Sequence, residues 1–397
     1  MKKLFLLSLL VSFIFVSCDK VEKYTKDGME AYEKGKYDEA IENFTKAVEE
    51  DPEKAGVAAR MLGLCYLDLD KEVGIEDDQL AFENLKIAAE AGDTLGIYWL
   101  GYAYDKGIGT LQDDEKAVAN YKKAAKMGNA EGMAKMAFLH YHGYQGVDRN
   151  EKEAVKLAKK ASDMGNFDAL AILGLAYDEG LGGFKKDQEK AAKLYSKAAE
   201  GGSLDGMALL GYEYMYGEGG LNENQSKGVK LVEKAAKKGS LYGLRFMGFV
   251  YEDKLDGRHG DAKAAFRKAI DAGDDFSIYL LGDRLNDENS NKDQKEGIKW
   301  LEKAMDKGIP EAMASLAYAY EYGRGVTKSY DKAFELYSKA SQHDNMPLWC
   351  YNNLGYCYEM GHGTPKNREK AIEWYKIAAD KGNETSRNNL KNLGVIY

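Results

Sequence analysis

The sequence predicts an all-α fold, an α/α superhelical solenoid of stacked helix pairs. First, the pattern Leu-Gly-x-x-Tyr, Gly-x-Gly, Lys-Ala and Lys-Ala-Ala-x-x-Gly returns about ten times along the 397 residues. Second, successive units are 34 to 39 residues apart, a period typical of helix pairs rather than of a globular enzyme domain. Third, an isolated helix of about a dozen residues is only marginally stable, so each helix pair must bury its apolar face on the next pair. One glycine or alanine marks each unit: Gly63, Gly101, Ala137, Gly174, Gly211, Gly248, Gly282, Ala317, Gly355 and Gly394.

Within one unit, the spacing of small and aromatic residues predicts how the two helices meet. In the first helix, Leu100, Gly101 and Tyr104 share one face, because positions i, i+3 and i+4 are neighbours on a helical turn. A glycine at the contact removes the side chain that would hold the helices apart, and we expect Tyr121 of the second helix to fill the space beside it. The Gly-x-Gly that follows ends the first helix, since glycine adopts the left-handed conformation at little cost.

These repeats resemble the Sel-1-like repeats, a family related to the tetratricopeptide repeat. About nine such units fill residues 57–383. The resemblance implies a solenoid with a long concave surface, used by an adaptor that binds other proteins. After the repeats, residues 384–397 form a single helix whose polar stretch suits a C-terminal cap. Before them, residues 24–56 resemble a plain tetratricopeptide repeat that acts as an N-terminal cap and carries its signature residues: Gly28, Gly35, Tyr37, Ala40, Phe44, Ala47 and Pro52.

The first residues predict an export signal. Two lysines precede an apolar run over residues 4–16, which ends in Ser17 and Cys18. A cysteine at this place resembles the lipobox of bacterial lipoproteins, although Phe15 stands where leucine is usual. We therefore expect residues 1–17 to be a signal peptide, Cys18 to be lipidated, and residues 18–23 to be a tether. This places the solenoid outside the cytoplasm, anchored to the inner or outer membrane of the bacterial envelope. The alternative is an uncleaved N-terminal anchor helix.

Composition excludes one class of partner. The formal net charge is −9, and charged residues make up 30% of the chain. A surface of that sign repels phosphate backbones, so we expect no nucleic-acid partner. Most charges alternate in sign along the predicted helices, which is typical of solvated faces.

The chemistry-bearing residues predict neither an active site nor a cofactor. His140 and His142 have a spacing found in metal sites, but His140 takes the place of a packed tyrosine in the other repeats, so we expect no metal. Cys350 and Cys357 lie two turns apart on one helix, about 10 Å by the helical rise, which is beyond disulfide reach. We expect Cys65 and Cys357 to be packed free thiols. No pair of acids stands out for general acid and base catalysis.

One column of side chains suggests a recognition surface. In tetratricopeptide repeats the residue after the motif glycine, and those three and six before it, face the concave groove. Aromatic residues and arginine give large contact areas at interfaces for little lost entropy. The same rings could instead pack between neighbouring repeats, and the sequence leaves both interpretations open. At the corresponding positions of this chain, the predicted groove residues are Tyr98, Tyr102, Phe138, Tyr212, Tyr242, Arg245, Phe249, Tyr318, Trp349, Asn352 and Tyr356.

Residues 248–300 depart most from the repeat pattern. The Gly-x-Gly is missing after Gly248 and Gly282, and the steps shorten to 34 and 35 residues. Because changed turns alter the rotation between units, we expect a local change of curvature there.

The sequence therefore predicts a non-catalytic, membrane-tethered scaffold that binds a protein or peptide in its concave groove. The alternative is a binder of small ligands, with glycan or peptidoglycan fragments stacking on the groove tyrosines.

Overall fold

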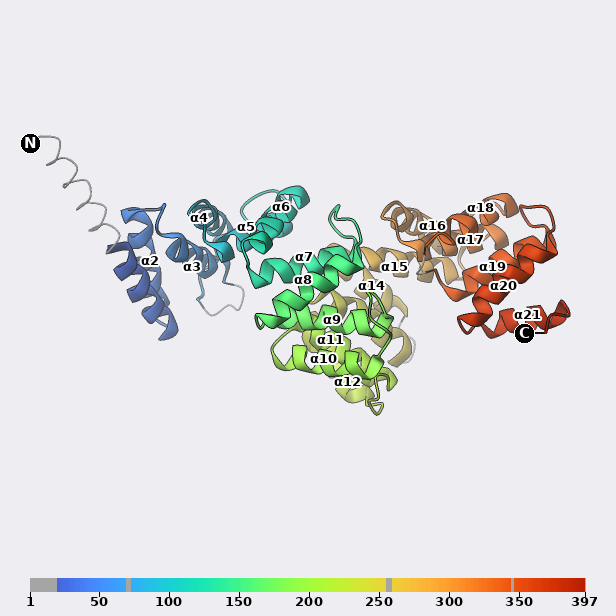
Figure 1. Cartoon of the computed structure of the whole chain (residues 1–397). Coiled ribbons are helices and arrows are strands. Elements are labelled where there is room, and N and C mark those ends of the chain that lie inside the picture. The colour runs from blue at the N-terminus through green and yellow to red at the C-terminus, as the bar shows by residue number, and fades with distance from the viewer. Residues whose placement is uncertain (1–19, 69–72, 255–258, 344–345, 397) are drawn as a thin grey trace, which may run out of the picture. The chain divides into compact units, whose positions relative to one another are not determined.

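A computed structural model describes residues 20–68, 73–254, 259–343 and 346–396, and every regular element in these ranges is a helix (Figure 1). The predicted all-α solenoid is confirmed: helices alternate as first (A) and second (B) members of stacked pairs. The A helices are α3 (Gly56–Leu67), α5 (Thr94–Lys106), α7 (Ala130–His142), α9 (Phe167–Glu179), α11 (Leu204–Tyr216), α13 (Leu241–Phe249), α15 (Asp275–Asp287), α17 (Pro310–Tyr322) and α19 (Leu348–Met360). The B helices are α4 (Asp78–Glu90), α6 (Asp114–Lys126), α8 (Glu151–Asp163), α10 (Gln188–Glu200), α12 (Gln225–Lys237), α14 (His259–Asp271), α16 (Asn291–Asp306), α18 (Tyr330–Ala340) and α20 (Arg368–Asp380).

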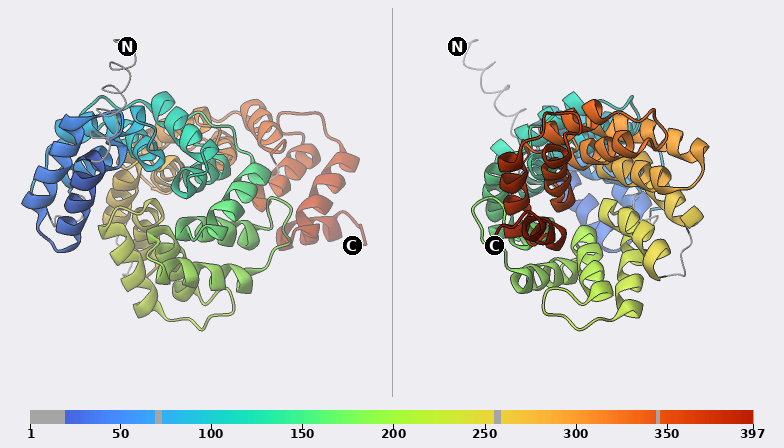
Figure 2. Two further views of the ribbon diagram at one scale, coloured as in Figure 1. Left: turned by 60° about the vertical axis from the view of Figure 1, so that its left-hand side comes forward. Right: turned by 90° about the vertical axis from the view of Figure 1, so that its right-hand side faces the viewer.

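The chain divides into two compact units. Unit 1 runs to Glu213 and includes residues Gly217–Glu223, whereas unit 2 consists of Tyr214–Tyr216 and the residues from Asn224 onward. Within each unit, consecutive helices pack as antiparallel neighbours, as the two views of Figure 2 show. No helix among the described residues has the length and apolar character needed to cross a membrane.

Helix ends follow from local chemistry. Most helices begin after an Asp, Asn or Ser whose side chain accepts a backbone N–H of the first turn; Asp113, for example, accepts the Lys116 N–H at 2.9 Å. The A helices commonly end at a glycine with positive φ, such as Gly107 at 68°. This conformation costs most other residues energy, so the first glycine of Gly-x-Gly stops the helix as predicted.

The motif glycine brings the two helices of a pair into contact. A Cβ at Gly101 would lie 3.0 Å from a ring atom of Tyr121, and one at Gly355 would lie 2.8 Å from Tyr375. Both tyrosines are fully buried. The predicted contact between a small residue on helix A and a tyrosine on helix B is therefore confirmed.

The second glycine of Gly-x-Gly has a role that the sequence did not predict. A Cβ at Gly109 would meet the Asp78 carbonyl oxygen and would lie 2.7 Å from Cβ of Phe82, both in the first turns of α4. Gly363 makes the same approach to Tyr330 and Phe334 of α18. At these two places the turn after the A helix thus packs on the B helix of the preceding pair, and glycine is the residue that permits this stacking.

Both ends of the described chain are capped by helices. A helix over residues 20–33 precedes α2 (Tyr37–Glu50), and Val21 and Phe44 are buried between them. Residues 20–23, predicted to be part of a tether, thus belong to this helix. Cys18 and the predicted signal peptide lie outside the described residues. At the other end, α21 (Glu384–Asn392) packs on α20.

The three cysteines of the repeats are free and buried, as predicted for Cys65 and Cys357. Burial raises the pKa of the Cys65 thiol to about 11 and that of Cys357 to about 12. These thiols are therefore protonated at neutral pH and act as small apolar residues in the core.

The divergent repeat replaces its glycine turn with a π-helix. Helix α13 has only 9 residues, and the π-helix η1 (Val250–Lys254) continues it. The expected change of curvature in this region stays a prediction.

Candidate functional site

The A helices form the closer-packed side of each stack. In unit 1, α3 contacts α5, α5 contacts α7 and α7 contacts α9, and in unit 2 α15 contacts α17, in addition to their B neighbours. The predicted groove residues lie on these A helices, and their position on a concave surface stays a prediction.

In unit 1, α5 presents three adjacent aromatic side chains. The rings of Trp99 and Tyr102 are 5.2 Å apart, and those of Tyr98 and Trp99 are 5.4 Å apart. Tyr98 also packs on the buried Tyr121, at 5.5 Å. All three are half-buried. Tyr98 and Trp99 also pack against the buried core of this region. Trp99 was not among the predicted residues.

On α7, Phe138 belongs to a second aromatic group. Its ring lies 4.6 Å from His142 and 5.8 Å from Tyr144. The ammonium of Lys135 lies 5.6 Å from the Phe138 ring and 3.0 Å from the buried Asp105 carboxylate on α5. These contacts join neighbouring A helices and give Phe138 a fixed position.

The middle of the predicted column is more deeply packed. Tyr212, at the end of unit 1, is half-buried, whereas Tyr242 on α13 is only 5% exposed. Phe249 is half-buried and packs on Phe266 of the partner helix α14, at 5.8 Å. Tyr242 is therefore mainly a core residue.

Two polar members of the column are engaged in bonds between repeats. Arg245 donates from Nε to Asp274, the buried N-cap of α15, at 2.9 Å. Asn352 accepts hydrogen bonds from Ser386 and Asn389 of α21, at 2.9 and 3.0 Å. Both side chains hold successive units together, which leaves little of their hydrogen-bonding capacity for a partner.

In unit 2, aromatic residues gather near the ends of α17 and α19. The Tyr318 ring lies 4.5 Å from Tyr322 and 6.2 Å from Trp349. His362 stacks on Tyr330 at 3.8 Å and lies 5.6 Å from Tyr356. Tyr322 is 56% exposed. The sequence missed Tyr322, Tyr330 and His362, because they lie outside the groove columns, at the end of α17, at the start of α18 and in the turn after α19.

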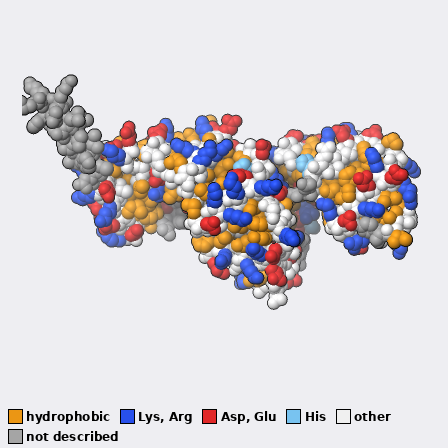
Figure 3. All heavy atoms as spheres, in the orientation of Figure 1, with side chains coloured by type: hydrophobic (Ala, Val, Ile, Leu, Met, Phe, Trp, Pro, Cys, Tyr) orange, Lys and Arg blue, Asp and Glu red, His pale blue; other side chains and the backbone are white. Residues whose placement is uncertain are grey.

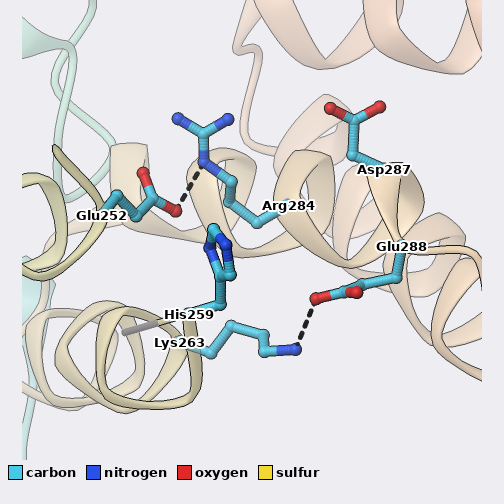
Figure 4. A pocket seen from close by; sticks show the side chains of 6 residues that line it. All are labelled: Glu252, His259, Lys263, Arg284, Asp287 and Glu288. Carbon is cyan, nitrogen blue, oxygen red and sulfur yellow. Dashed lines mark hydrogen bonds and ion pairs between the residues drawn. The ribbon is translucent and has the colours of Figure 1, made fainter. Parts of the chain in front are cut away.

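A separate charged cavity of about 350 Å³ lies in the divergent repeat (Figure 4). Arg284 on α15 contacts Glu252 of η1 through Nε, at 2.7 Å, and Lys263 on α14 contacts Glu288 at 2.8 Å. The other lining residues are His259 and Asp287. No sequence motif had pointed to this cavity.

Within the described ranges, no group of three or more His, Cys, Asp or Glu side chains could hold a metal ion. His140 is half-buried, and its Nδ1 lies 3.1 Å from the Asp148 carbonyl oxygen. On the face shown in Figure 3, acidic and basic side chains are interspersed with apolar ones.

A family model of helical repeats matches most of the chain. The Sel1 repeat model matches residues 56–93, 94–129, 130–166, 167–203, 204–240, 276–309, 310–345 and 350–383. A Sel1 repeat protein from Oxalobacter formigenes is 25% identical, with a TM-score of 0.44 over 62% of this chain and 96% of that one. A protective antigen of uropathogenic Escherichia coli, with an SLR fold, is 24% identical, with a TM-score of 0.37 over 89% of this chain and 82% of that one.

Among curated proteins, a chitin synthase regulator of Saccharomyces cerevisiae is 34% identical over 67 residues. That match spans 17% of this chain and 9% of the yeast protein. Residues 241–275, which hold the π-helix, lie outside the matched repeats. Since the matched repeats cover well over half of its length, the chain belongs to the Sel1 repeat family.

Proposed function

We propose that this protein is a non-catalytic scaffold, tethered to a membrane of the bacterial envelope, that binds a protein partner along its A helices. One observation carries the proposal: aromatic side chains on several A helices contact neighbouring rings and are only half-buried. Such rings lose little entropy on binding and are common anchors of protein interfaces.

The surface that we propose for the partner consists of half-buried rings only. In unit 1 its centre is Tyr102, beside Trp99, and in unit 2 it is Tyr318 with Tyr356. Arg245 and Asn352 support these rings indirectly, because they join the repeats on which the rings are placed.

A capture experiment tests the partner surface. After crosslinking in cells, the wild-type chain should capture a partner protein. A variant with Tyr102, Tyr212 and Tyr356 changed to Ala should not capture it, because the central contact area is lost. The matched control changes the exposed lysines Lys122, Lys193 and Lys299 on B helices to Ala. Both variants must remain helical by circular dichroism. Equal capture by all three forms would contradict the proposal. Binding of a soluble peptidoglycan fragment instead would favour the small-ligand alternative.

The membrane tether rests on the sequence of residues 1–18 alone. Cells grown with a radiolabelled fatty acid should label the wild-type chain and not Cys18→Ser, and the variant should leave the membrane fraction. A Cys18→Ser chain that stays in the membrane would support the alternative of an uncleaved anchor helix.

A further inference from the structure

One side chain in unit 1 breaks a pattern of the A helices. The exceptions to this pattern are Arg284 on α15 of unit 2 and Glu213 on α11 of unit 1. Glu213 is only 2% exposed. Because an ionised carboxylate is costly to bury, the surroundings decide which form of this acid the fold can hold. The pattern is a buried apolar residue two places after the motif glycine or alanine: Cys65, Ala103, Leu139, Ala176, Val250, Ala319 and Cys357.

The carboxyl group of Glu213 lies under the turn that follows its own helix. A Cβ at Gly219 would lie 2.6 Å from Glu213 Oε2, so the turn Gly217–Glu223 contacts the carboxyl group directly. The same Cβ would lie 2.6 Å from Cβ of Ala192 and 3.0 Å from the carbonyl oxygen of Gln188, both on α10. The turn is therefore seated on the first turns of α10 and covers the carboxyl group of Glu213.

The surroundings of Glu213 favour its neutral form. Its Oε2 has no hydrogen-bond partner among the described residues. The charged groups that act on it are Asp178 on α9, Glu218 in the turn that covers it, and Lys186 in the turn after α9. Glu189, in the first turn of α10, adds a further carboxylate close to the covering turn. Burial, together with the charges of Asp178 and Glu218, raises the pKa of Glu213 to about 8.

The covering turn can move more easily than the helices around it. It begins with Gly217, and Gly219 and Gly220 follow within three residues, so this stretch has few side chains that could anchor it. Its backbone N–H groups at Gly217 and Glu218 donate to the carbonyl oxygen of Glu213, and these bonds are local. Helices α9 and α10, in contrast, bury side chains along their length. Displacement of the turn is therefore the least costly way to bring water to an ionised Glu213.

We propose that Glu213 and the turn Gly217–Glu223 form a pH-sensitive latch in unit 1. While Glu213 is protonated, the turn stays closed on α10. When Glu213 loses its proton, Asp178 and Glu218 repel the new charge, and the turn opens and uncovers the first turns of α10. The closed form holds the proton more tightly than an exposed carboxyl group does, so opening becomes easier as pH rises from about 5 to about 8 and then levels off. The latch is independent of the proposed partner surface.

Hydrogen exchange of the full-length chain, read by mass spectrometry, tests the latch. Wild type and Glu213→Gln are compared at pH 5 and at pH 8, so that the intrinsic pH dependence of exchange cancels between the two proteins. At pH 5 the turn Gly217–Glu223 should exchange at similar rates in both. At pH 8 it should exchange at least about tenfold faster in wild type, because each pH unit in this range shifts the opening equilibrium by up to about tenfold. The protection of α9 should be the same in both proteins.

The matched control is Glu189→Gln, which removes an exposed carboxylate close to the same turn and should respond to pH as wild type does. Glu213→Leu is a second variant without a titratable group, and leucine is the residue of this column at Leu139. It should keep the turn closed at both pH values. The proposal is overturned by equal exchange of the turn in wild type and both Glu213 variants at pH 8. It is also overturned if α9 loses protection as much as the turn does, since that would be a general loss of stability and not a local opening.

Discussion

Gly109→Ala should destabilise unit 1 far more than Gly146→Ala. Both glycines lie in turns after A helices and have similar positive φ values, 61° and 73°. Alanine in this conformation costs ~1–2 kcal/mol at either site. At Gly109 the new Cβ would also meet the Asp78 backbone and lie 2.7 Å from Phe82, whereas at Gly146 nothing lies within 4 Å. The steric overlap should add ~1–3 kcal/mol at Gly109 alone.

The two variants are compared by urea unfolding and by hydrogen exchange of α4 and α5, because repeat arrays can unfold unit by unit. Gly109→Ala should lower the protection of these helices, and Gly146→Ala should leave it near the wild-type level. Equal losses in the two variants would mean that the second glycine serves only the turn conformation and not the stacking of repeats.

Glu213→Gln should remove a pH dependence of stability from unit 1. Glu213 lies in the same apolar column as Ala103 and Ala176, is 2% exposed, and has no hydrogen-bond partner for Oε2 among the described residues. Burial, with the nearby charges of Asp178 and Glu218, raises its pKa to about 8. The carboxyl group is therefore mainly protonated in the folded protein at neutral pH.

Because the folded pKa lies above the unfolded value of 4.5, the folded state holds a proton that the unfolded chain releases. Stability should therefore fall as pH rises from about 5 to about 8 and then level off. The total loss is on the order of 5 kcal/mol. Thermal unfolding across this range should show a smaller decline for Glu213→Gln, and an unchanged one for Glu200→Gln, which alters an exposed glutamate. Parallel curves for wild type and Glu213→Gln would contradict a buried acid.

The sequence predicted the features that depend on local spacing. The contact between Gly101 and Tyr121 follows from helical periodicity, and the helix end at Gly107 follows from backbone sterics. Both depend on residues within one repeat. The fold class could therefore be predicted from the repeat alone.

Features that depend on contacts between repeats could not be predicted in the same way. Gly109 is a turn glycine in the sequence, and its approach to Phe82 of the preceding repeat appears only in three dimensions. Arg245 was predicted to face a groove, yet its partner Asp274 is 29 residues away. The charged cavity combines η1, α14 and α15, and only the missing Gly-x-Gly indicated that this repeat was unusual.

The central claim, a protein partner along the A helices, is tested most directly by the position dependence of photo-crosslinking. A photoreactive residue is placed at Tyr102 or Tyr318 on A helices, and at Lys122 or Lys299 on B helices, and adducts formed in cells are identified by mass spectrometry. We predict that one discrete protein crosslinks from the A-helix positions and not from the B-helix positions. Crosslinks to that protein from both faces with equal yield, or from the B helices alone, would contradict the account.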